Sequence, residues 1–106
     1  MACEAEIQDF VDKVVEEFAP ERVILFGSHA RGDATPDSDV DLLVIMPTKK
    51  QAIDQAVEIR QRIRRSFPLD LIVKTPGDMA WRLSLHDCFL TTIVTEGKTL
   101  YESLGS

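Results

Sequence analysis

A continuous apolar run at residues 23–26, with the sequence VILF, constrains the fold of this chain more than any other feature. The run ends at Gly27, and its length and composition are typical of a β-strand that is buried on both faces. Residues 40–46, which end before Pro47, and residues 69–74 predict two more strands. A chain that buries such strands has to cover them with other elements.

Segments with helical periodicity surround these strands. Apolar residues from Ile7 to Phe18 recur at intervals of three and four and stop before Pro20, which predicts an amphipathic helix. Four further elements are expected, namely a helix over about 50–66, helical segments over 78–85 and 87–94, and a short strand over 98–101. In the helix over about 50–66, the side chains expected to face inward are Ile53, Ala56, Val57 and Ile63.

The order of these elements predicts an α/β or α+β domain, with helices packed on a small mixed β-sheet. Residues 27–38 are rich in Gly, Asp, Ser, Thr and Pro and are expected to form a loop. The chain has 106 residues, which is enough for one hydrophobic core, so a single domain over residues 1–106 is expected. This length leaves no room for separate substrate and cofactor lobes.

The charge of the chain is acidic and unevenly distributed. Eighteen Asp and Glu against twelve Lys and Arg give a net charge of −6. Residues 1–21 hold seven acids and one base, whereas residues 49–65 hold six bases and two acids. The net charge argues against a general binder of nucleic acid or of anionic membranes. With only two cysteines and no segment resembling a signal peptide, the cytoplasm is the expected compartment.

Asp39 and Asp41 stand two residues apart at the start of the second predicted strand. Residues i and i+2 of a strand share a face, so the two carboxylates are expected side by side, about 7 Å apart at Cα. Such a pair is costly unless a cation lies between the carboxylates or one of them is protonated. Mg²⁺ accepts one or two carboxylates and completes its shell with water and substrate phosphates. The pair therefore predicts a magnesium site.

Gly27 and Ser28 follow the first predicted strand. Glycine lets a ligand approach the backbone closely, and the free N–H groups of a turn into a helix can hold a phosphate, with the Ser28 hydroxyl as a further donor. The turn is not a P-loop, because the G-x-x-x-x-G-K-[ST] pattern is absent. A phosphate-binding turn and a carboxylate pair are thus expected on adjacent strands.

These residues together resemble a known signature. Gly27 and Ser28, followed after ten residues by Asp39 and Asp41, are similar to the motif of the DNA polymerase β-like nucleotidyltransferase superfamily. The fuller stretch over residues 27–42, with its internal ARG, resembles the minimal nucleotidyltransferase (MNT) branch of that superfamily. The resemblance covers nearly the whole chain and implies a nucleotidyltransferase fold.

The resemblance also implies roles for individual residues. Asp39 and Asp41 would hold metal that bridges the nucleotide phosphates, and a third carboxylate, which maps onto Asp70, would bind or deprotonate the attacking hydroxyl. The three carboxylates would hold one or two Mg²⁺ ions, with ATP as the substrate. Arg31 either contacts phosphate or braces the loop.

Small MNT proteins of this type are encoded beside HEPN-domain proteins, so the resemblance implies a HEPN toxin as partner. The leading hypothesis is transfer of AMP from ATP to that toxin, with this chain as the antitoxin of a type VII-like toxin–antitoxin pair. The alternative is a noncatalytic antitoxin or assembly subunit that neutralises a HEPN ribonuclease by complex formation. Transfer to a small molecule or polymerisation would require an acceptor pocket or a second lobe beyond one domain.

Overall fold

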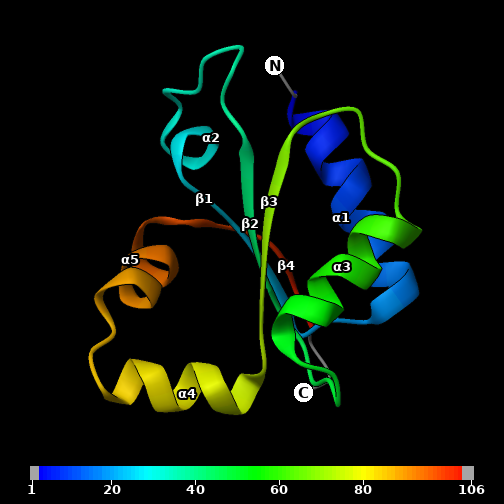
Figure 1. Cartoon of the computed structure of the whole chain (residues 1–106). Coiled ribbons are helices and arrows are strands. Elements are labelled where there is room, and N and C mark those ends of the chain that lie inside the picture. The colour runs from blue at the N-terminus through cyan, green and yellow to red at the C-terminus, as the bar shows by residue number, and fades with distance from the viewer. Residues whose placement is uncertain (1–2, 104–106) are drawn as a thin grey trace.

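The computed structural model describes residues 3–103, which form a four-stranded sheet with helices on both faces (Figure 1). The elements in chain order are α1 (Glu4–Phe18), β1 (Arg22–Phe26), α2 (Ser28–Arg31), β2 (Val40–Ile45), α3 (Ala52–Arg62), β3 (Leu69–Lys74), α4 (Pro76–Ser84), α5 (Cys88–Glu96) and β4 (Lys98–Glu102). The predicted architecture, a small sheet flanked by helices, is confirmed.

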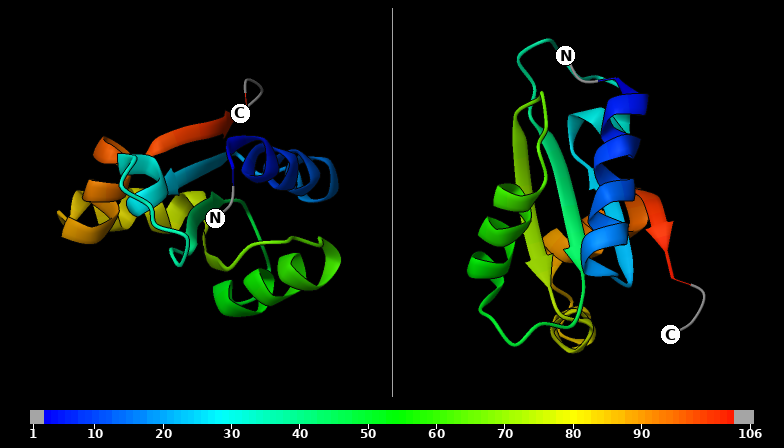
Figure 2. Two further views of the ribbon diagram at one scale, coloured as in Figure 1. Left: turned by 90° about the horizontal axis from the view of Figure 1, so that it is seen from above. Right: turned by 90° about the vertical axis from the view of Figure 1, so that its right-hand side faces the viewer.

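The sheet is mixed and has the strand order β3-β2-β1-β4. β1 pairs with β2 and with β4 in antiparallel fashion, whereas β2 and β3 run parallel. The right-hand view of Figure 2 shows β2 and β3 side by side, with α3 outside them. β2 is therefore an interior strand, and its backbone is paired on both sides.

Each face of the sheet has its own hydrophobic core. Figure 1 shows α1 and α3 on one side of the sheet and α4 and α5 on the other. The core under α1 and α3 takes the β2 residues Val40, Leu42 and Val44, which alternate along the strand. The core under α4 and α5 takes Leu43 and Ile45 from the opposite face of the same strand. Both cores thus meet on β2.

The inward face of α3 differs from the expectation at two positions. Ala56 and Ile63 are buried as predicted, but Ile53 is 70% exposed and Val57 is 45% exposed, so their predicted inward orientation was wrong. The stripe that meets the sheet runs through Ala56, Ile59 and Ile63, at intervals of three and four residues. Ile53 and Val57 lie on a neighbouring stripe that faces solvent.

A polar residue beside that stripe is buried because its side chain is satisfied. Gln55 is 4% exposed. Its amide oxygen accepts a hydrogen bond from the Thr48 hydroxyl at 2.7 Å, and its amide nitrogen donates to Glu58 at 3.0 Å. A buried amide with partners for both ends avoids the desolvation cost of an unpaired group.

The segment over residues 27–38, predicted as a loop, contains the short helix α2. Gly27 precedes α2 with φ of 76°, and Gly32 follows it with φ of 83°. Both angles lie in the region that favours glycine, so the two glycines allow the chain to enter and leave a single helical turn abruptly. The rest of the segment is not helical, as expected.

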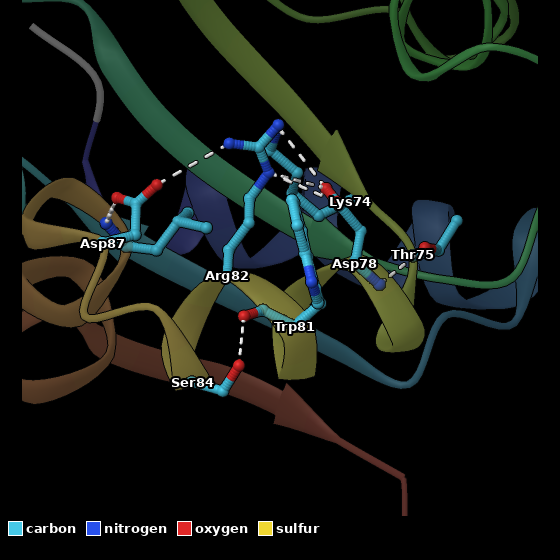
Figure 3. Close-up of polar contacts among 8 residues, drawn as sticks. Lys74, Thr75, Asp78, Trp81, Arg82, Ser84 and Asp87 are labelled. Atoms are coloured by element: carbon cyan, nitrogen blue, oxygen red, sulfur yellow. Dashed lines mark hydrogen bonds and ion pairs between the residues drawn. The ribbon is translucent and has the colours of Figure 1, made fainter.

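Polar contacts hold α4 and α5 in place at the end of β3 (Figure 3). The Thr75 hydroxyl caps α4 by accepting the Asp78 N–H at 3.1 Å, and the Asp87 carboxylate caps α5 by accepting the Leu90 N–H at 3.0 Å. Arg82 lies between the two helices, with Nε at 3.2 Å from Asp78 and Nη1 at 3.7 Å from Asp87. The cap of α5 is therefore tied to α4.

The helices between residues 3 and 103 are all too short or too polar to cross a lipid bilayer.

The corrected face of α3 gives a direct test of the core. Ile59 is fully buried, so Ile59→Ala should lower the free energy of unfolding by about 2–5 kcal/mol. Ile53→Ala removes the same atoms from an exposed position and should change it by less than about 0.5 kcal/mol. Urea denaturation of both variants measures the difference. Equal losses for the two variants would contradict the placement of α3.

Candidate active site

Two of the predicted carboxylates lie opposite each other on neighbouring strands. In the parallel register of β2 and β3, Asp41 is the direct partner of Asp70. Both residues are on the sheet face that carries Leu43 and Ile45, because residues two apart in a strand share a face. Asp70 is exposed and Asp41 is half-buried. The fold thus brings together two acids that are 29 positions apart in the sequence.

Gly27 lies against the Asp41 carboxyl group. β1 and β2 place Phe26 opposite Asp41, so the next residue, Gly27, reaches the side chain of Asp41. A Cβ atom on Gly27 would lie 3.1 Å from the Asp41 Cγ and would overlap one of its carboxylate oxygens. Glycine is therefore required at position 27 for two reasons, the φ of 76° and the space that the carboxylate takes.

Ser28 and Arg31 are the first and last residues of α2, immediately after Gly27. The amide groups of Ala30 and Arg31 both donate to the Gly27 carbonyl at 3.1 Å, which leaves the earlier amides of the turn outside the helical bonding pattern. Arg31 is exposed, and its Nε lies 3.3 Å from the Asp33 carboxylate. It braces the loop in this way and also borders the pocket described next.

A pocket of about 340 Å³ opens where these elements meet. Its size is at the lower end of the range for small-molecule sites. The lining comes from β1, α2, β2, β3 and α5 and comprises Phe26, Gly27, Ala30, Arg31, Asp41, Asp70, Phe89, Thr92, Ile93, Glu96 and Gly97. Four residues predicted for the site, Gly27, Arg31, Asp41 and Asp70, are therefore brought into one pocket.

Two predicted site residues are placed differently, and several lining residues were not predicted. Ser28 and Asp39 are close in sequence to the lining residues Gly27 and Asp41, but they do not line the pocket themselves. Asp39 is exposed, one residue before β2. The contribution of α5, with Phe89, Thr92 and Glu96, was missed, because the helical pattern of that segment carries no signal for a ligand.

The donor chemistry of the site fits a magnesium ion bound together with phosphate. Within residues 3–103, His, Cys, Asp and Glu side chains nowhere gather in groups of three or more that could hold a metal ion. A closed cage of protein ligands is therefore not preformed. Mg²⁺ seldom requires one, since one or two carboxylates and substrate phosphates usually bind it. Asp41 and Asp70 supply such a pair of hard oxygen donors.

The pKa of Asp41 is raised above the ordinary value of an aspartate. Burial is the largest cause, followed by the negative charges of Asp70 and Asp39, whereas His29 and Arg31 act in the opposite direction. The ionised form of Asp41 is thus disfavoured in the folded chain. A cation at this position would relieve the same repulsion.

The raised pKa makes a prediction about stability. An acid whose pKa is raised by folding stabilises the fold at low pH, and this stabilisation is lost as the pH rises through the folded-state pKa. Asp41→Asn carries no charge, so it should increase the free energy of unfolding at pH 7. The gain should shrink as the pH falls through the raised pKa of Asp41 and should be lost below about 3.8, the ordinary value for the group.

Denaturation with urea at a series of pH values, with a chelator present, measures this difference. Asp37→Asn is the matched control, because Asp37 is exposed in the loop before β2 and should change the free energy of unfolding by less than about 0.5 kcal/mol at pH 7. A less stable Asp41→Asn variant at pH 7 would show that the carboxylate is not under strain.

Known proteins share this sequence pattern and fold. The family model described as a nucleotidyltransferase domain matches residues 7–98. Putative protein adenylyltransferase MJ1305 of Methanocaldococcus jannaschii is 38% identical over 104 residues, covering 91% of this chain and 69% of the relative. Putative protein adenylyltransferase MJ0604 of the same organism is 24% identical over 100 residues, covering 92% and 97%.

Solved structures agree on the fold. The crystal structure of a putative nucleotidyltransferase from Sulfolobus solfataricus has a TM-score of 0.65 and 23% identity, with 96% of this chain and 82% of that chain covered. The crystal structure of a toxin–antitoxin with AMP-PNP has a TM-score of 0.60 and 22% identity, with 92% and 74% covered. The family match, which includes the residues of the pocket up to Gly97, shows that this chain belongs to the nucleotidyltransferase domain family and is a nucleotidyltransferase.

Proposed function

We propose that this chain is a Mg²⁺-dependent protein adenylyltransferase that transfers AMP from ATP to a HEPN-domain toxin and thereby acts as its antitoxin. The observation that carries the proposal is the placement of Asp41 opposite Asp70, with Gly27 against the Asp41 carboxylate, in one open pocket. This arrangement offers oxygen donors for a cation beside a turn whose first amides lie outside the helical bonding pattern and could bind a phosphate.

In the proposed reaction, Asp70 and Asp41 have different roles. A hydroxyl oxygen of the acceptor forms a bond to the α-phosphorus of ATP, and the bond from that phosphorus to the oxygen that bridges it to the β-phosphate breaks, so that pyrophosphate leaves. The hydroxyl proton passes to a carboxylate, for which we assign Asp70, the exposed member of the pair. Asp41, deeper in the pocket, stays with the phosphates.

Asp39, Asp41 and Asp70 are the residues that would hold one or two Mg²⁺ ions. When bound, Mg²⁺ neutralises charge on the phosphate oxygens and on the leaving pyrophosphate. Asp39 lies outside the pocket lining in this structure, but its negative charge contributes to the raised pKa of Asp41, which supports its inclusion in the set. Arg31 and the Gly27–Ser28 turn would contact the phosphates from the other side.

A protein acceptor is supported by the relatives and by the shape of the site. The two relatives from Methanocaldococcus jannaschii are named as protein adenylyltransferases, and a fold neighbour is a toxin–antitoxin crystallised with AMP-PNP. The pocket is small and at the surface, with Asp70 exposed at its edge. A hydroxyl on another protein can reach such an edge.

Transfer of label tests the proposal. The purified chain is incubated with Mg²⁺, ATP labelled at the α-phosphate and the HEPN protein encoded next to it, and label on the HEPN protein is followed with time. We expect transfer by the wild-type chain, and a rate at least about 100-fold lower for the Asp39→Ala, Asp41→Ala double variant, because it loses two of the carboxylates that would hold the metal ion bound to the phosphates.

The matched control is the Asp37→Ala, Asp54→Ala double variant, which removes the same charge from two exposed positions and should transfer label as the wild type does. The absence of label on the HEPN protein with wild-type chain would contradict the enzymatic proposal. Full protection of cells from the toxin by a folded Asp39→Ala, Asp41→Ala variant would show that binding alone neutralises the toxin.

A further inference from the structure

The pocket has an apolar side that the proposed function leaves without a role. Besides the carboxylates, β1 and α5 contribute Phe26, Phe89 and Ile93 to the lining. A nucleotide combines the same two kinds of group, since an anionic phosphate chain is joined through ribose to a flat aromatic base that can stack on an apolar surface. The pocket therefore offers both kinds of surface that a nucleotide requires, a polar one for the phosphates and an apolar one for the base.

Among these apolar lining residues, Phe89 is the most exposed. It is 55% exposed, although Leu90 and Ile93 of the same helix are buried. Single exposed aromatic residues are common and have no meaning by themselves. Phe89 differs because it lines the pocket that holds Asp41 and Asp70. Its exposed ring surface therefore faces a site that already has binding chemistry.

The ring of Phe89 has support from a second aromatic residue. Its centroid lies 5.9 Å from that of Phe26, with the two planes at 88°, which is an edge-to-face contact. Phe26 in turn is the β1 residue opposite Asp41. The contact fixes the side chain of Phe89 near the carboxylates while more than half of the residue stays exposed.

The backbone of Phe89 is also held firmly. It is the second residue of α5, directly after the cap made by Asp87. Asp87 pairs with Arg82 of α4, and Arg82 pairs with Asp78, as Figure 3 shows. A platform for a flat ligand has to be rigid in this way, because stacking depends on the orientation of the ring.

We propose that Phe89 stacks on the nucleobase of the bound nucleotide while the phosphates lie at the Gly27 and Asp41 end of the pocket. This inference rests on the proposed function, since it presupposes that the pocket takes a nucleotide. Stacking is tolerant of base identity, because every base has a flat π-face. Phe89 thus contributes affinity for the nucleotide rather than a choice between bases.

Binding of ATP and of inorganic tripolyphosphate, both with Mg²⁺, separates the base from the phosphates. By isothermal titration calorimetry, Phe89→Leu should raise the Kd for ATP at least about fivefold, which corresponds to about 1 kcal/mol. It should leave the Kd for tripolyphosphate unchanged. Phe89→Tyr keeps an aromatic ring and should retain the affinity for ATP.

Trp81→Leu is the matched control. Trp81 is an aromatic residue of α4 that is 59% exposed, and it does not line the pocket. It should bind ATP as the wild type does. The thermal midpoint of each variant shows that it is folded, and the exposure of both rings makes a large loss of stability unexpected.

Two results would overturn the inference while the proposed function stands: an unchanged Kd for ATP in Phe89→Leu, or an equal loss of affinity for ATP and tripolyphosphate. If the Kd for ATP is unchanged and transfer to the protein acceptor is slower, the ring lies against the acceptor instead. A wild-type chain that binds no nucleotide would instead overturn the proposed function, and this inference with it.

Discussion

The burial of β2 on both of its faces is the constraint on which the rest of the structure depends. Its backbone is paired with β1 on one side and with β3 on the other, and its apolar side chains enter two separate cores. Helices are therefore required above and below the sheet. Asp41 is the one β2 residue that is not fully buried, and it lies on the α4 and α5 face, where the pocket reaches the sheet.

The position of Asp41 on the same strand disfavours its ionised form. Parallel pairing of β2 with β3 sets two carboxylates opposite each other, and partial burial adds to their repulsion. Gly27 leaves just the space that the Asp41 carboxyl group occupies. A structure with no use for a cation or a phosphate gains nothing from such a placement, and functional sites are where proteins tolerate strain of this kind.

Much of this could be predicted from the sequence, for identifiable physical reasons. Short apolar runs mark interior strands, and the runs at residues 23–26 and 40–46 correspond to β1 and β2, the two interior strands of the sheet. The pairing of Asp41 with Asp70 was not visible in the spacing of residues, because it depends on the parallel register of two strands. The resemblance to a known signature singled out Asp70 without that register.

Other features depend on tertiary context that no local pattern contains. In α3, two overlapping apolar stripes fit a helix equally well, and packing against the sheet selects the one through Ile59. Gln55 is buried because Thr48 and Glu58 satisfy its amide, although a polar residue predicts exposure. The position of Phe89 at the pocket depends on how α5 packs beside β1, where its ring contacts Phe26, and a helical pattern cannot show this packing.

A crystal structure of the chain with Mg²⁺ and AMP-PNP would show whether Asp41 and Asp70 bind a metal ion together with the phosphates. We expect a metal ion that contacts Asp41 and Asp70 and a triphosphate that lies against the turn at Gly27. Phosphates bound elsewhere, for instance beside the exposed Arg64 and Arg65 after α3, with no metal ion on the two carboxylates, would contradict this expectation.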